Sequence, residues 1–150
     1  MKTSQKGISL IKGHEDCSLT AYKCPAGVWT IGYGHTGTVN SKPIDKNTVI
    51  SELMAETLLA IDLEEVEYSL NKNLIPKCEL TQNEFDALIS FVFNIGVFAF
   101  LQSSMFKLLV RGKKKYAAEQ FDRWIYAKGK KLAGLIKRRA EEKSLFLQTS

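Results

Sequence analysis

The chain has 150 residues, 45% of them hydrophobic and 25% charged, with a formal net charge of +5. A chain of this length buries about 68–70% of its unfolded surface, which is enough for one domain with a core of its own. It has no run of roughly 18 apolar residues that could span a membrane, and its three cysteines are an odd number that does not suit a disulfide scaffold.

Positive charge gathers in the last third of the chain. Residues 107–143 hold 13 Lys and Arg against 4 acids, whereas residues 44–86 hold 10 acids against 3 lysines. A basic region is compatible with any polyanion, whether nucleic acid, membrane surface or cell-wall polymer, and equally with a solvated helix face. The first residues lack the apolar core of a secretory signal, so we expect synthesis in the cytosol.

The N-terminal third predicts a helix followed by a β-hairpin. A short helix around Ile8 to Ile11 is expected to end before Thr20. The segments TAYK and VWTIGY are rich in β-branched and aromatic residues, and they flank the sequence Cys24-Pro25-Ala26-Gly27. Proline at the second position and glycine at the fourth favour a type I turn, so the two segments are predicted to pair.

The remainder predicts helices. Residues 45–71 contain no Gly or Pro and place apolar residues near helical spacing, which predicts one long helix that ends by Pro76. The sequence Thr81 to Glu84 matches a capping box that opens an apolar helix, and Gly96 can close it. Residues 116–126 and 135–147 predict two more helices separated by a loop at 127–134. The predicted fold class is α+β, mainly α, with the hairpin apart from a helical body.

Glu15 is the first candidate for chemistry, because it lies at the end of the first predicted helix. A carboxyl held against apolar neighbours stays protonated and can donate to a leaving oxygen, although most glutamates are surface residues. Metal-ligand types also occur nearby, but they lack the C-x₂₋₄-C spacing of structural zinc sites; they are His14, Cys17, Cys24 and His35. Phosphate-loop, nucleophile-elbow and dinucleotide motifs are absent, so we predict neither a metal nor a cofactor.

Three blocks carry a resemblance to a known family. The segment EDCSLTAYKCPAGVWTIGYGHT at residues 15–36 resembles the catalytic segment of the phage-type lysozymes, a family of glycoside hydrolases that includes the endolysins. LTQNEFDALISFVFNIG at residues 80–96 resembles the family's central core helix, and RWIYAKGKKLAGLIKRRAEEKSLF at residues 123–146 resembles its C-terminal pattern. The blocks occur in the family's order and span nearly the whole chain.

The resemblance implies a muramidase, which hydrolyses the β-1,4 bond between N-acetylmuramic acid and N-acetylglucosamine in peptidoglycan. It also implies a lysozyme-like fold, in which a small N-terminal lobe with the hairpin and a helical C-terminal lobe are joined by a long helix and enclose a cleft. We therefore expect a single domain over residues 1–150. Its parts are a small lobe at about 14–50, a connecting helix at about 47–72 and a helical lobe at about 73–150.

The resemblance also implies roles for individual residues. Glu15 matches the catalytic acid and Thr30 the threonine that helps hold the attacking water, while Cys24 falls where many members have an aspartate. Because a retaining path needs a carboxylate nucleophile and an inverting path needs a positioned water, the hypothesis is inversion, with Glu15 protonating the glycosidic oxygen and the water held by Thr30 and Cys24. A thiol of ordinary pKa is mostly neutral at pH 7, so we expect Cys24 to be a weak base and mainly an orienting group. Asp16 is the nearest spare carboxylate, but it matches a residue that is usually glycine in the family.

Further residues receive structural or binding roles. We expect His35 to tie the hairpin to a neighbouring element and Trp29 to pack in the small lobe. The C-terminal pattern implies ion pairs that organise the helical lobe, made by Arg138, Arg139 and Glu142. The substrate-binding candidates are Tyr22, Thr36, Phe98 and Arg138.

The leading interpretation is a monomeric phage endolysin that acts on peptidoglycan glycan strands, with no nucleic-acid partner and no stable membrane insertion. It would be made in the host cytoplasm, need a holin for release and act on the wall in the periplasm. Three alternatives stay open: a host-encoded wall-remodelling muramidase, a catalytically silent wall-binding module, and a nucleic-acid-binding module based on the basic third. A disulfide between Cys17 and Cys24 that silences the site is a further hypothesis.

Overall fold

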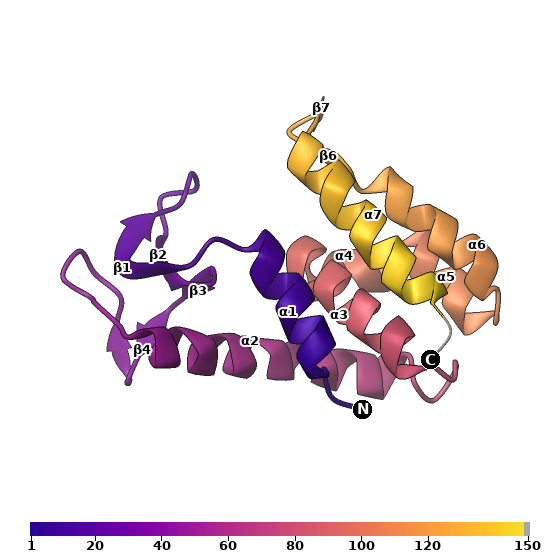
Figure 1. The fold of residues 1–150 in the computed structure, drawn as a ribbon, viewed down its shortest axis with the longest axis horizontal. Helices are drawn as coiled ribbons and strands as arrows, with labels where there is room; N and C mark the ends of the chain where they lie inside the picture. Colours follow the sequence, from indigo (N-terminus) through magenta and orange to yellow (C-terminus); the bar gives the residue numbers. More distant parts are fainter. Residues whose placement is uncertain (149–150) are drawn as a thin grey trace. The chain divides into compact units, whose positions relative to one another are not determined.

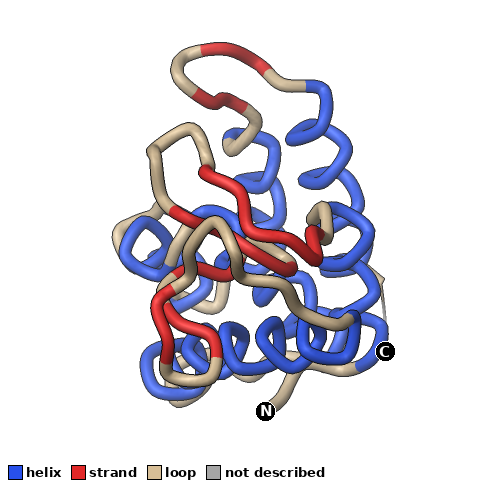
Figure 2. The backbone as a smooth tube through the Cα atoms, turned by 90° about the vertical axis from the view of Figure 1, so that its left-hand side faces the viewer, coloured by secondary structure: helices blue, strands red, loops and turns tan. Residues whose placement is uncertain are grey.

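A computed structural model describes residues 1–148. Its contacts divide the chain into two units, of which one is Lys12–Glu64 and the other combines Met1–Ile11 with the chain from Glu65 onward. The α+β, mainly α class predicted from the sequence is confirmed, as the ribbon and the tube coloured by secondary structure show (Figures 1 and 2). None of the helices within residues 1–148 is long and apolar enough to cross a membrane.

The first unit is built around a three-stranded antiparallel sheet in the order β1-β2-β3. Helix α1 (Gln5–His14) leads into β1 (Ser18–Lys23), which pairs with β2 (Trp29–Gly32), and β2 pairs with β3 (His35–Thr36). The predicted hairpin is confirmed. A second ribbon, β4 (Thr38–Val39) with β5 (Lys42–Pro43), follows it. The core of the unit consists of Ile31, Ile44, Ile50, Ala55 and Leu58.

Helix α2 (Glu52–Asn73) begins later than the predicted residue 47. The preceding residues form a local turn, because the Asp45 carboxylate accepts from the Asn47 backbone N–H at 2.8 Å and the Thr48 hydroxyl accepts from the Asp45 N–H at 2.9 Å. Such side-chain bonds to backbone compete with a helix. The hydroxyl of Ser51 then caps the helix by accepting from the Met54 N–H at 3.1 Å.

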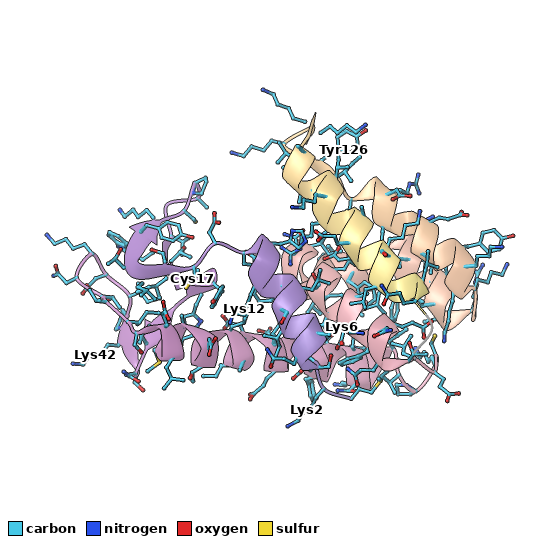
Figure 3. All side chains as sticks on the ribbon, viewed as in Figure 1. Lys2, Lys6, Lys12, Cys17, Lys42 and Tyr126 are labelled. Atoms are coloured by element: carbon cyan, nitrogen blue, oxygen red, sulfur yellow. The ribbon has the colours of Figure 1, made fainter. Side chains whose placement is uncertain are left out.

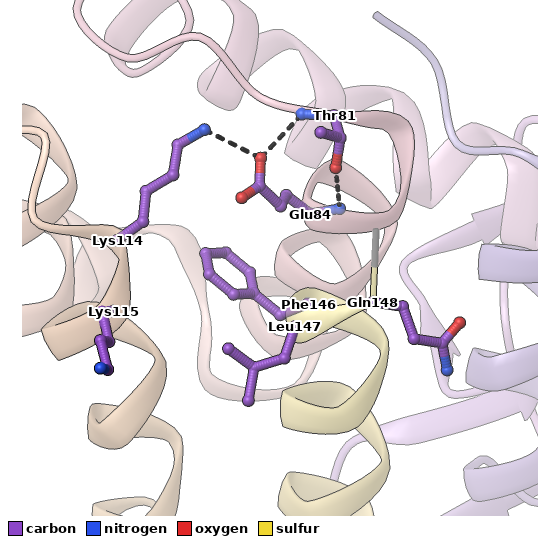
Figure 4. A pocket seen from close by; sticks show the side chains of 7 residues that line it. All are labelled: Thr81, Glu84, Lys114, Lys115, Phe146, Leu147 and Gln148. Carbon is purple, nitrogen blue, oxygen red and sulfur yellow. Dashed lines mark hydrogen bonds and ion pairs between the residues drawn. The ribbon is translucent and has the colours of Figure 1, made fainter. Parts of the chain in front are cut away.

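The second unit centres on α3 (Gln82–Ile95), which is buried from Phe85 to Val92. The predicted capping box is present: the Thr81 hydroxyl accepts from the Glu84 N–H at 3.1 Å, and the Glu84 carboxylate accepts from the Thr81 N–H at 2.8 Å (Figure 4). Gly96, at a φ of 96°, closes the helix as expected. The three short helices that follow were not predicted as separate elements, and they are α4 (Val97–Leu101), α5 (Ser104–Val110) and α6 (Lys114–Glu119).

The predicted helix at 116–126 and the predicted loop at 127–134 are both wrong in part. The chain leaves α6 through a 3₁₀ turn (Gln120–Arg123) and then forms a hairpin, β6 (Tyr126–Ala127) with β7 (Lys130–Lys131), before α7 (Ala133–Leu147). The hairpin forms because Lys128 and Gly129 both take a positive φ, of 52° and 78°. A two-residue loop of that kind matches the twist of a β-ribbon.

Polar bonds join the N-terminal segment, residues 1–11, to the helices of its own unit. The Asp86 carboxylate, on α3, accepts from the Ser4 N–H at 3.0 Å and from the Ser4 hydroxyl, and the Thr3 hydroxyl donates to Glu67 at 2.7 Å. At Gly7 an added Cβ would lie 2.8 Å from the Asp86 carboxyl carbon, so only glycine allows α1 to approach α3 this closely.

A buried ion cluster joins α7 to α3, as the C-terminal pattern implied. The Glu142 side chain has no exposed surface and accepts from Ser90 at 2.5 Å, from Arg138 at 3.2 Å and from Arg139 at 3.2 Å. Arg139 Nε also lies 2.7 Å from Glu142 Oε1, an ion pair without hydrogen-bond alignment. The Arg139 guanidinium stacks over Phe91 at 5.0 Å. A buried carboxylate with two guanidinium partners is costly to disturb, because removing one charge leaves the others unpaired.

We therefore expect Glu142→Gln to lower the free energy of unfolding by about 3–5 kcal/mol, measured by urea denaturation. The matched control is Glu119→Gln, an exposed glutamate of the same unit, which should change stability by less than about 0.5 kcal/mol. Equal stability of the two variants would show that the cluster does not hold the helices together.

Candidate active site

Glu15 lies directly after the last residue of α1 and before β1, where it is half-buried. Asp16 and Cys17 separate it from the start of β1. Its carboxyl therefore belongs to the same unit as the hairpin, which carries the other two predicted catalytic residues.

Cys24 opens the hairpin turn, and its backbone closes that turn on both sides. Its N–H donates to the Val28 carbonyl at 2.9 Å, and its carbonyl accepts from the Gly27 N–H at 2.8 Å. The backbone N–H groups of Val28 and then Ala26, followed by the Thr30 hydroxyl, lower the pKa of the Cys24 thiol. Donors directed at the sulfur stabilise the thiolate over the thiol. This turn, called the cradle below, therefore favours the thiolate of Cys24 over its thiol.

Thr30 lies on β2 and is 4% exposed. Its hydroxyl donates to the Val28 carbonyl at 3.0 Å. A hydroxyl has one proton and two acceptor sites, so donation to Val28 and donation to the Cys24 sulfur exclude each other. In the structure the Thr30 hydroxyl donates to Val28. Rotation of this hydroxyl about its Cβ–Oγ1 bond would direct its proton at the Cys24 sulfur instead.

The register of the sheet brings two predicted binding residues beside Thr30. Tyr22 is the cross-strand partner of Thr30 on β1, and Thr36 is its partner on β3. Directly opposite residues of antiparallel strands project from the same face. Tyr22, Thr30 and Thr36 therefore form one row across the sheet, and the flanking members, Tyr22 at 42% and Thr36, are exposed.

The opposite face of the sheet is structural. Ile31 pairs with His35 across β2 and β3, and Ile31 is fully buried. His35 Nδ1 lies 2.9 Å from the Asp62 carboxylate on α2, and its Nε2 lies 2.8 Å from the Thr38 carbonyl. Trp29 packs against the core of the unit. The structural interpretations of His35 and Trp29 are confirmed.

Sequence reasoning missed a cluster around Tyr33. Burial, followed by the neighbouring Cys17, raises the pKa of the Tyr33 phenol. Lys12 Nζ lies 5.7 Å from the Tyr33 ring centre and 2.6 Å from the Glu56 carboxylate. Only the return of the chain through the hairpin brings these residues together, so no local pattern could have identified them.

The cysteines are all free thiols, so the hypothetical disulfide between Cys17 and Cys24 is not formed. Cys17 lies beside Tyr33, while Cys24 faces the turn and Thr30. The suggested metal ligands do not assemble either: within residues 1–148 there is no group of three His, Cys, Asp or Glu side chains placed to hold an ion.

Two other predicted binding residues belong to the second unit, referred to below as the helical unit. Phe98, on α4, is 76% exposed, whereas Arg138 is 4% exposed and is bonded to Glu142 and Ser90. Their contact with substrate stays a prediction.

Two hollows of that unit, of about 270 and 260 Å³, have none of the predicted catalytic residues in their linings. The first is lined by Ser104, Gln120, Arg123 and Trp124. The second lies beside the α3 capping box, where Lys114 Nζ is 3.0 Å from the Glu84 carboxylate (Figure 4).

The chain is similar to phage lysozymes over nearly its whole length. The family model "Phage lysozyme" matches residues 12–142. The endolysin of Acyrthosiphon pisum secondary endosymbiont phage 1 is 45% identical over 97% of this chain and 98% of its own length. The endolysin of Bacillus phage PZA is 42% identical over 97% of this chain, but the chain spans only 55% of that protein.

Two solved structures, one of a lysozyme and one of a muramidase domain, have the same fold as this chain. A mutant P22 lysozyme superposes with a TM-score of 0.88 at 35% identity, with 99% of both chains covered. The muramidase domain of SpmX from Asticaccaulis excentricus superposes with a TM-score of 0.86 at 39% identity, again over 99% of both chains.

The cradle at Cys24 predicts a difference between thiols. In a protein whose only cysteine is Cys24 (Cys17→Ser with Cys78→Ser), the rate of alkylation by iodoacetamide should reach half its maximum at a pH below about 8.5, the ordinary thiol pKa. A lowered pKa means more thiolate at a given pH and so faster alkylation.

The matched protein with Cys78 alone should titrate at a higher pH, because burial raises the pKa of the Cys78 thiol. Identical midpoints, or the reverse order, would contradict the proposed cradle.

Proposed function

The chain belongs to the phage lysozyme family, and from this premise we propose that Glu15, Cys24 and Thr30 form its catalytic site and that it hydrolyses the glycosidic bond with inversion. Membership makes the protein a muramidase that acts on peptidoglycan. The observation that carries the site assignment is the hairpin turn, whose donors lower the pKa of the Cys24 thiol beside the Thr30 hydroxyl.

The reaction starts with Glu15 as general acid. Its carboxyl proton passes to the glycosidic oxygen as the bond from that oxygen to the anomeric carbon breaks, which leaves an oxocarbenium-like centre. Glu15 becomes a carboxylate, and its negative charge stabilises the positive centre that remains. The step needs no nucleophile from the protein.

Water completes the reaction from the opposite face of the sugar. The Thr30 hydroxyl accepts one hydrogen bond from this water through its free lone pair, and the Cys24 thiolate accepts the proton that the water loses on attack. A thiol of ordinary pKa would be protonated for most of the time at pH 7, and the N–H groups of the turn raise the thiolate fraction. Exchange with solvent then removes the proton from the Cys24 thiol and returns one to Glu15, which restores both groups.

Retention of configuration is disfavoured by the chemistry of the site. A retaining enzyme holds a carboxylate nucleophile about 5–5.5 Å from the acid. By the family resemblance, Cys24 falls where many members have an aspartate, and the nearest spare carboxylate, Asp16, is the immediate neighbour of Glu15 in the chain. A cysteine with a water-holding threonine suits inversion.

The biological role that we propose is lysis of a bacterial host. The endolysin names of the relatives support a phage enzyme. We propose that it is made in the host cytoplasm, released by a holin and active on glycan strands in the periplasm as a monomer. The match to the SpmX muramidase domain favours a second candidate, a host-encoded wall enzyme. Co-expression with a holin separates them, because abrupt lysis that depends on the holin supports the phage role, and slow lysis without it supports the second.

The first prediction of the site assignment concerns Glu15. Purified protein should clear a suspension of Gram-negative cells stripped of their outer membrane, and Glu15→Gln should clear it about 1,000-fold more slowly, since a general acid contributes about 10²–10⁴-fold. The control is Glu64→Gln, an exposed glutamate of the same unit, which should keep parental activity.

Full activity of a folded Glu15→Gln protein would exclude Glu15 as the acid. If the folded parent itself fails to clear cells but binds purified peptidoglycan, the chain is a silent wall-binding module. The same assay compares two neighbours of Glu15. Cys24→Ala should lose about 100-fold, the low end for a general base, and Asp16→Asn no more than about twofold. The opposite order would assign the role of base to Asp16.

A second prediction concerns stereochemistry. Proton NMR of soluble glycan fragments during hydrolysis should show the α-anomer of the new reducing end first, before mutarotation forms the β-anomer. Appearance of the β-anomer first would establish retention and would require a protein nucleophile. A retaining lysozyme run on the same fragments is the control.

A further inference from the structure

The β6–β7 hairpin is the most exposed secondary structure of the helical unit. It projects past the N-terminal end of α7 in both ribbon views, and every residue from 126 to 134 is exposed (Figures 1 and 2). Unlike the β1–β2 hairpin, which contributes Ile31, it contributes no residue to the core. Its shape is therefore not explained by packing.

The hairpin carries unbalanced positive charge. Residues 123–140 contain seven Lys and Arg and no acid. Two of these, Arg138 and Arg139, are buried in the ion cluster with Glu142. The other five are exposed, and within residues 1–148 no carboxylate pairs with the lysines of the hairpin; these are Lys128, Lys130 and Lys131.

Lys128 occupies a costly position at the tip. Its φ of 52° lies in the left-handed region, where a loop of this kind favours Asn or Gly. A long cationic side chain at such a position is disfavoured by local sterics. A residue that local sterics disfavour suggests a role outside the fold.

Apolar side chains accompany the lysines. Tyr126 is 59% exposed and is the cross-strand partner of Lys131, while Leu132 and Ile136 are 43% and 40% exposed. The Tyr126 ring stands out beside the hairpin in the side-chain view (Figure 3). Tyr126 and Lys131 share one face of the ribbon, and Lys130, the partner of Ala127, projects from the other. An exposed element that carries lysines, a tyrosine and aliphatic side chains is typical of those that lie in a membrane interface.

We propose that the β6–β7 hairpin docks on the surface of an anionic phospholipid bilayer. The lysine ammonium groups contact lipid phosphates, while Tyr126 and Leu132 enter the headgroup layer without spanning the bilayer. A duplex nucleic acid fits less well, because the three lysines of the hairpin offer point charges rather than the planar guanidinium forks that read base edges. Docking would hold a muramidase at the membrane that adjoins its substrate, and it does not depend on the catalytic assignment.

The test is sedimentation with vesicles. Each lysine near an anionic surface strengthens binding about fivefold, so Lys128→Gln with Lys130→Gln and Lys131→Gln should weaken binding to vesicles of phosphatidylglycerol and phosphatidylethanolamine about 100-fold. The matched control removes three exposed lysines elsewhere, by Lys42→Gln, Lys46→Gln and Lys77→Gln, and should weaken it less than about tenfold. Thermal melting checks that both variants are folded.

Three outcomes overturn the proposal: equal binding to vesicles of phosphatidylcholine alone, equal weakening by the two triple variants, or tighter binding to a DNA duplex that the hairpin variant loses. Tyr126→Ser separates a docked hairpin from loose charge attraction. In 0.5 M salt the Debye length is only about 4 Å, so charge attraction is screened. Tyr126→Ser should still weaken vesicle binding relative to the parent under these conditions. Equal binding of the two proteins would exclude insertion of Tyr126 into the headgroup layer.

Discussion

The antiparallel register of β1, β2 and β3 is the constraint on which the site depends. Side chains alternate between the two faces of a strand, so one register decides every assignment at once. It sends Ile31 and His35 to the face that holds the core and the Asp62 contact, and it leaves Thr30 in a row with Tyr22 and Thr36 on the other face. A slip by one residue would exchange the two faces and expose Ile31. The buried pair, Ile31 and His35, thus fixes the position of Thr30, the proposed water-holding residue.

The turn that joins β1 to β2 adds a second requirement. The backbone of Cys24 closes the hairpin through its bonds to Val28 and Gly27, and the N–H groups of Val28 and Ala26 lower the pKa of its thiol. A carboxylate in that place would be ionised without assistance, since its ordinary pKa lies far below 7. A thiol needs the donors. In the proposed mechanism, the donors of the loop favour the thiolate form that Cys24 needs as a base.

Local signals in the sequence predicted the elements that local interactions determine. The turn at Cys24 to Gly27, the capping box at Thr81 and the helix end at Gly96 all follow from residues within four positions of one another, and all are present. The start of α2 was misplaced because Asp45 and Thr48 bond to their own backbone, which hydrophobic spacing does not reveal. The β6–β7 hairpin was missed because Lys128 takes a left-handed conformation that its residue type does not suggest.

The same distinction applies to the site. The resemblance of the hairpin segment to the family was enough to propose Glu15, Cys24 and Thr30. The row that Tyr22 and Thr36 form with Thr30 depends on the strand register. The cluster of Lys12, Tyr33 and Cys17 could not be proposed from the sequence, because its members meet only after the sheet has formed. Its position matters for Glu15, which lies two residues before Cys17 in the chain. The segment that carries the proposed acid therefore lies between the last turn of α1 and a residue that neighbours the Tyr33 phenol.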